Sequence, residues 1–300
     1  MPEVDVRVAA RSLKAVLFSW LVASLAGPLT LFVAVVGQGV GACLGGCTWI
    51  GVSLPADRQV WALVNQPVVN FASTAAAIPY WLGSLILPLL LAAVLIPFVP
   101  RARSVAGELV MVQLSWMLAV VGGAWLPLLD PAQGHLVPLL GFRMLPGGLV
   151  WLAPITAGVT VLLPTLRLIA LARVASGDIS RLGRMGLVVT HLAPPVVAWG
   201  ALVSVLRGAP PLAACAAALL LLALALVIAW VGYPPPFVQT LVPLRAASFA
   251  WAGVVLAALI GLWWFTGRAL PGDQRAGILW GHRDARNNVR AWIAPTQLGE

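Results

Sequence analysis

The chain has 300 residues, of which 61% are hydrophobic and 9% are charged, with 18 basic residues against 9 acidic ones. Soluble domains carry about 25% charged residues, so this composition excludes a soluble protein and indicates an all-α, polytopic membrane protein with one embedded domain. The net charge of +9 resides mostly on arginines at the ends of apolar runs. We therefore expect the lipid bilayer, and not nucleic acid, as their partner.

Seven apolar segments approach the length of about 20 residues that crosses a bilayer. In chain order they are residues 15–37, 76–99, 105–128, 148–170, 186–206, 211–232 and 247–266. Arg7, Arg11 and Lys14 precede the first segment, as in a signal peptide, but the apolar run is too long for one. We predict an uncleaved first helix and about seven spans.

Basic residues are distributed unequally between the two sides, which predicts the orientation. With the N-terminus inside, the inner segments hold Arg7, Arg11, Lys14, Arg101, Arg103, Arg167, Arg173, Arg181, Arg184 and Arg245. The outer connections hold only Arg58, Arg143 and Arg207. Cytoplasmic loops are the more basic ones, so we predict the N-terminus inside and the C-terminus outside, in a bacterial inner membrane. Five arginines after the last segment oppose this rule, and a span count that differs by one is the alternative.

Two regions outside the spans have recognisable patterns. Residues 38–75 are apolar but broken, which favours an interfacial or re-entrant segment. In the tail, residues 268–300, apolar residues recur at helical spacing between basic ones, which predicts an amphipathic surface helix. The tail residues expected to contact the membrane or a partner are Arg283, Arg286, Arg290 and Trp292. A solvated tail with accidental periodicity is the alternative.

Three ionisable residues fall inside predicted spans, where charge is costly and often functional. Glu108, Arg167 and His191 all lie in the cytoplasmic third on this topology. Together they can form a proton relay, an anion site or half of a metal site. Alternatively, Glu108 and Arg167 reach the membrane surface, and His191 binds a carbonyl group that the adjacent prolines leave free.

Small residues recur every four positions in two places and predict close helix packing. The two faces are Gly37, Gly41 and Gly45, and Gly253, Ala257 and Gly261. Their neighbours can belong to this chain or to another. Cys43 and Cys47 allow a disulfide on the outer side, although their spacing on a regular helix is near the limit for one.

The chain lacks the motifs that would indicate a catalytic centre. The sequence contains no H-E-x-x-H, G-x-S-x-G or Walker A pattern, and it predicts no catalytic residue, metal ligand or identifiable cofactor. The leading hypothesis is a non-catalytic subunit or assembly factor of a larger membrane complex, bound to other subunits or to itself. The alternatives are a small-solute or ion transporter that uses Glu108, Arg167 and His191, and an intramembrane enzyme that acts on lipid or protein.

Overall fold

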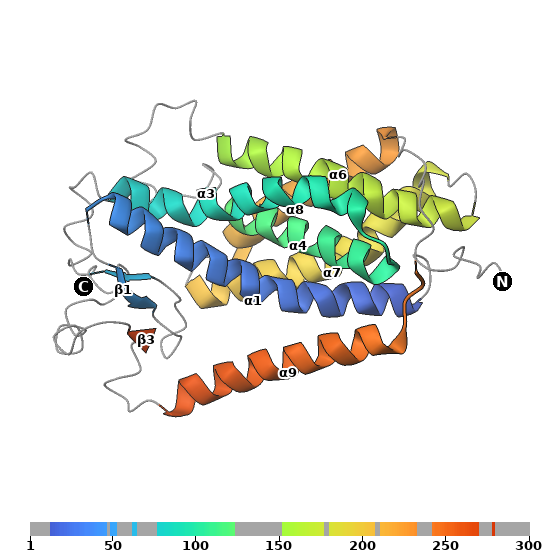
Figure 1. Ribbon diagram of the computed structural model, residues 1–300. Helices are drawn as coiled ribbons and strands as arrows, with labels where there is room; N and C mark the ends of the chain where they lie inside the picture. Colours follow the sequence, from blue (N-terminus) through green and yellow to red (C-terminus); the bar gives the residue numbers. More distant parts are fainter. Residues whose placement is uncertain are drawn as a thin grey trace.

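The computed structural model describes residues 13–46, 49–52, 62–64, 77–123, 152–176, 180–207, 211–232, 242–269 and 278–279. Within these ranges, seven α-helices lie lengthwise alongside one another (Figure 1). They are α1 (Leu13–Leu44), α3 (Ala77–Leu95), α4 (Val105–Gly123), α6 (Leu152–Ser176), α7 (Arg181–Arg207), α8 (Pro211–Val231) and α9 (Ala246–Ala269). A short 3-10 helix, η2 (Ile96–Arg101), joins α3 to α4.

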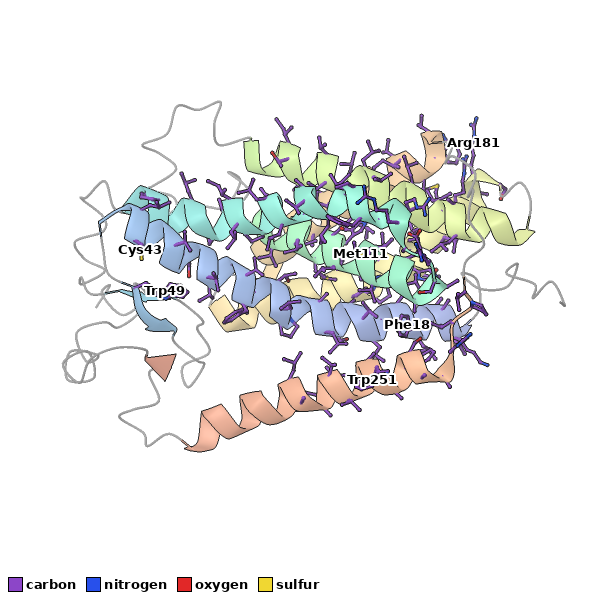
Figure 2. All side chains as sticks on the ribbon, viewed as in Figure 1. Phe18, Cys43, Trp49, Met111, Arg181 and Trp251 are labelled. Atoms are coloured by element: carbon purple, nitrogen blue, oxygen red, sulfur yellow. The ribbon has the colours of Figure 1, made fainter. Side chains whose placement is uncertain are left out.

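The helices have two distinct ends. Helices α1, α4, α7 and α9 begin at one end, where α3, α6 and α8 finish (Figure 1). We call this the basic end, because its described side chains include Lys14, Arg101, Arg103, Arg181, Arg184 and Arg245. At the opposite end α1 finishes and a small sheet lies against it, so we call this the sheet end. Cys43 and Trp49 lie at the sheet end, far from Arg181 (Figure 2).

Helix α4 occupies the centre of the bundle. It contacts α1, α3, α6, α7 and α8. Leu109, Trp116 and Met117 on this helix are fully buried. Because most of α4 is buried, a polar side chain on its buried sides must find a partner inside the protein.

Three helical stretches are long and apolar enough to cross a membrane, namely Leu13–Leu44, Leu82–Val99 and Val105–Gly122. The apolar stretches Ile155–Leu171, Ala218–Val231 and Ala246–Gly261 are shorter. The prediction of a helical membrane protein is confirmed at this level. Each of the seven predicted segments coincides with a helix, although α1 continues to Leu44 and α7 begins earlier, at Arg181. Passage of all seven helices through the bilayer stays a prediction.

Large apolar side chains also cover the outside of the bundle. On α1 and α3, Leu29, Phe32, Leu90 and Val94 are each roughly half exposed. A helix that is apolar on its outer as well as its inner side is typical of membrane spans, because lipid covers the outer side.

The sheet was not predicted from the sequence. It has three strands in the order β2-β1-β3, which are β2 (Ala62–Val64), β1 (Trp49–Val52) and β3 (Ile278–Leu279), and both pairings are antiparallel. Strand β3 belongs to the C-terminal tail, for which helical spacing was expected from Ile278 onward. These two residues form a strand instead, because β1 offers them an edge to pair with.

Helices α1 and α3 approach each other most closely at two glycines. A Cβ atom added to Gly37 would fall on the carbonyl oxygen of Gly83, and one added to Gly83 would fall on that of Gly37. One turn further, Gly41 is also buried, and the N–H of Gly45 donates to the Gly41 carbonyl (2.9 Å) just beyond the helix. Of the predicted glycine face, Gly37 therefore has a close helix neighbour within this chain.

Helix α9 is attached mainly to α1 and diverges from it toward the sheet end (Figure 1). The attachment includes an edge-to-face contact between Phe18 and Phe249, whose ring centroids are 5.1 Å apart. The second predicted small-residue face differs from the first. Cβ atoms added to Gly253 and Gly261 would meet no atom within 4 Å.

Candidate functional site

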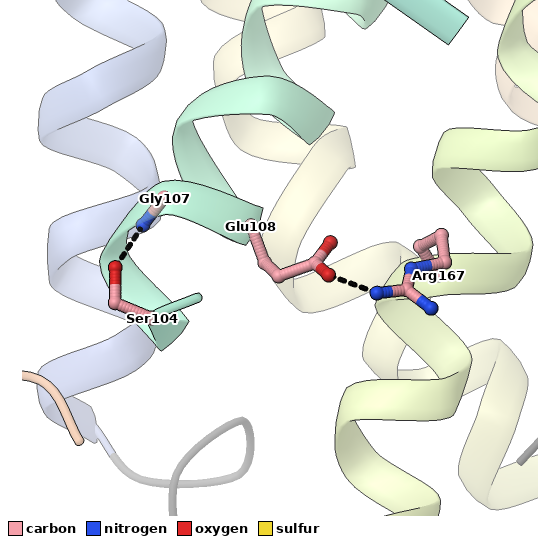
Figure 3. Close-up of polar contacts among 4 residues, drawn as sticks. All are labelled: Ser104, Gly107, Glu108 and Arg167. Carbon is pink, nitrogen blue, oxygen red and sulfur yellow. Dashed lines mark hydrogen bonds and ion pairs between the residues drawn. The ribbon is translucent and has the colours of Figure 1, made fainter. Parts of the chain in front are cut away.

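The site begins at the N-terminus of α4, at the basic end. The Ser104 Oγ accepts a hydrogen bond from the backbone N–H of Gly107 at 3.1 Å and caps the helix (Figure 3). Val242, just before α9, adds a parallel bridge: its carbonyl accepts from Val105 N–H (3.0 Å), and its N–H donates to the Arg103 carbonyl (2.9 Å). These bonds fix the first turn of α4, from which Glu108 projects.

Glu108 forms a buried ion pair with Arg167 of α6. The Arg167 Nη2 donates to Glu108 Oε1 (Figure 3). The Glu108 side chain is fully buried, and that of Arg167 is 9% exposed. Glu108 lies in the first turn of α4, where the positive end of the helix dipole also favours a carboxylate. The pair brings two residues of the predicted cluster of Glu108, Arg167 and His191 into contact, and the Glu108 side chain does not reach the surface.

A second polar contact lies further along α4 and joins three helices. The side-chain amide of Gln113 donates to Ser19 Oγ of α1 (2.6 Å) and to the backbone carbonyl of His191 on α7 (3.0 Å). Gln113, Ser19 and His191 are all fully buried. The His191 carbonyl lies where Pro195 occupies the position four residues later, and a proline cannot donate the usual helical hydrogen bond. Gln113 therefore supplies a donor from another helix at a proline-interrupted turn.

Both buried polar contacts are made by side chains of α4. We call the two α4 side chains Glu108 and Gln113, together with their partners Arg167, Ser19 and His191, the polar axis. Sequence reasoning identified Glu108, Arg167 and His191 but missed Gln113 and Ser19. The missed signal was a glutamine within an apolar run, because an amide buried among apolar residues needs partners as a charge does. Among the described residues, Glu108 Oε2 and Gln113 Oε1 have no hydrogen-bond partner, so each retains the capacity to accept one further bond.

The remaining predicted residues lie elsewhere. Cys43 is exposed at the sheet end, whereas Cys47 lies outside the described residues, so their disulfide stays a prediction. Arg283, Arg286, Arg290 and Trp292 also lie outside the described part of the chain. Within the described ranges, no group of three or more His, Cys, Asp and Glu side chains is placed to hold a metal ion.

In comparisons with known proteins, no family model matches this chain, and no curated protein or solved structure is detectably similar to it. A function for the chain is therefore inferred from its own geometry. That geometry offers a neutralised ion pair, an amide that bridges three helices, and one peripheral helix with an open face.

Proposed function

We propose that all seven helices cross a bacterial inner membrane, with the N-terminus inside and the C-terminus outside. Two observations support this orientation. The basic end carries Lys14 and five arginines, which is typical of a cytoplasmic surface. The sheet pairs β1, which follows α1, with β3, which follows α9. That pairing puts the segment after α9 at the end opposite to the start of α1, as an odd number of spans requires.

Within that membrane, the chain acts as a non-catalytic subunit or assembly factor of a larger complex, and the open face of α9 binds the partner. Trp251, Val254 and Ile260 on α9 are 72%, 60% and 59% exposed. Gly253 and Gly261 sit in the same helix, where each glycine costs about 1 kcal/mol of helix propensity relative to alanine. Close approach of a second transmembrane helix offsets that cost, whereas contact with fluid lipid does not.

Native mass spectrometry after gentle extraction tests this proposal. The natural chain should leave the membrane in a complex with a defined partner or with a second copy. Ala257→Leu fills the small-residue face and should release the partner. Ala258→Leu is the matched control, because Ala258 is also exposed but lies about 100° around the helix. A lone chain in every sample, or equal loss with both variants, would contradict the proposal.

Transport of a small solute or ion is the second candidate, favoured by the polar axis of α4. A buried carboxylate and a buried amide oxygen, each with a free acceptor site among the described residues, are groups that a proton or a solute can use. The test is flux into liposomes. Glu108→Gln and His191→Ala should abolish the flux, and Ser24→Ala, an exposed position on α1, should leave it unchanged. If Glu108→Gln and His191→Ala left the flux unchanged, the polar axis would have no part in transport.

A further inference from the structure

The basic end carries five exposed cations, which we call the cation cluster. Lys14 comes from α1, Arg101 from η2, Arg103 from the turn before α4, Arg181 from α7, and Arg245 from the turn before α9. All five are exposed. Among the described residues, Glu108 is the sole acidic side chain, and its charge is already matched by Arg167. The cation cluster therefore has no acidic partner in the described part of the chain.

Aromatic side chains lie beside two of these cations. The Arg101 guanidinium lies over the Phe98 ring and that of Arg181 over the Trp230 ring, each 5.4 Å from the ring centroid. Phe98 and Trp230 are themselves 46% and 44% exposed. A guanidinium held above an exposed aromatic ring fits the membrane–water boundary, where the ring faces lipid and the cation faces the head groups.

One arginine at this end has a different role. The Nη1 of Arg184 donates to the carbonyl of Gly232 at 2.6 Å, directly after α8. Arg184 thereby satisfies a carbonyl at the negative end of the α8 dipole and is not available to an external anion. Among the side chains that the structure describes, the cations left for an external partner are the five exposed ones.

We propose that the cation cluster binds the phosphate groups of anionic phospholipids. It thereby selects anionic lipids over neutral ones from the surrounding leaflet. Phosphate oxygens are strong acceptors for guanidinium groups, and an anionic lipid also supplies the negative charge that the described end of the bundle lacks. The inference requires that the helices cross a membrane, but it is independent of any protein partner.

The experiment uses the full chain in nanodiscs that contain equal amounts of dioleoyl phosphatidylglycerol and dioleoyl phosphatidylcholine. Mass spectrometry then counts the lipids of each kind that remain bound after mild detergent treatment. We expect enrichment of phosphatidylglycerol. The triple variant R101Q/R103Q/R245Q should lower the enrichment by about fivefold per arginine removed, and added salt should lower it in the natural chain.

The matched control is R101K/R103K/R245K, which keeps the charge and should keep the enrichment. Both variants change exposed residues, and their melting temperatures report whether they fold. Equal retention of the two lipids by the natural chain would overturn the proposal. So would an unchanged enrichment in the folded glutamine variant, or an equal fall in the lysine variant.

Discussion

Removing one member of the Glu108–Arg167 pair should destabilise the protein far more than removing both. Glu108→Leu leaves the Arg167 guanidinium in a site where its side chain is 9% exposed. Two unit charges about 4 Å apart attract each other by about 4 kcal/mol at an effective dielectric constant of 20. Loss of a single partner from a buried pair typically costs about 3–5 kcal/mol, because the remaining charge is uncompensated. We expect Glu108→Leu to lower the free energy of unfolding by that amount.

The double variant Glu108→Leu/Arg167→Met removes both charges and replaces them with apolar groups that suit the interior. Its free energy of unfolding should return to within about 2 kcal/mol of the natural value, since buried pairs are often replaceable by apolar residues at little cost. Unfolding in mixed micelles of dodecyl maltoside and sodium dodecyl sulfate measures all three proteins. Arg245→Met, at an exposed arginine, is the control and should change stability by less than about 0.5 kcal/mol.

Additive effects would refute this reasoning. If the double variant were destabilised by the sum of the two single changes, the two side chains would not interact energetically. If Glu108→Leu cost less than about 1 kcal/mol, Arg167 would have access to water or to head groups once its partner was removed. Either result would show that the pair does not hold α4 to α6.

Three further outcomes follow from the packing. Gly37→Ala should lower the free energy of unfolding by about 1–3 kcal/mol, because the new methyl group meets the α3 backbone where α1 and α3 cross. Gly186→Ala is the control and should not lower it, because its methyl group meets no atom. The same micelle titration measures both variants. Gln113→Leu should cost about 1–2 kcal/mol in that titration through two lost interhelical hydrogen bonds. Gly39→Val should displace the Trp49 indole, because the indole occupies the space that a Cβ atom would take. Faster backbone hydrogen exchange in β1 would report this displacement, and unchanged exchange would refute the contact.

The helices were predictable from the sequence because their cause is local. Each apolar run needs internal backbone hydrogen bonds once lipid surrounds it, and a helix supplies them within the run. Helix α7 begins before the predicted segment 186–206, and its first residues are polar. Ser180 carries the missing signal, since its Oγ accepts the Gly183 N–H at 3.1 Å as an N-cap.

Contacts between residues far apart in the sequence were harder to predict from the sequence. The sequence identified Gly37 as a contact position but gave no means to find Gly83 opposite it, because a glycine face specifies closeness and not a partner. Glu108 and Arg167 were identified by the cost of charge in a membrane, yet their direct pairing depends on how α4 and α6 rotate. Strand β3 was missed since it is only two residues long and its partner β1 lies near the other end of the sequence.

The antiparallel pairing of β1 with β3 sets an order of events during biogenesis. Gly51 emerges early in synthesis, but its partner Leu279 is translated only after α9. The ladder therefore cannot close until α9 has been made and placed beside α1. A chain that stops after α9 would keep its helices but leave one edge of β1 without its strand, open to pairing with another polypeptide. Closure of this small sheet thus requires that synthesis has passed Leu279, beyond α9.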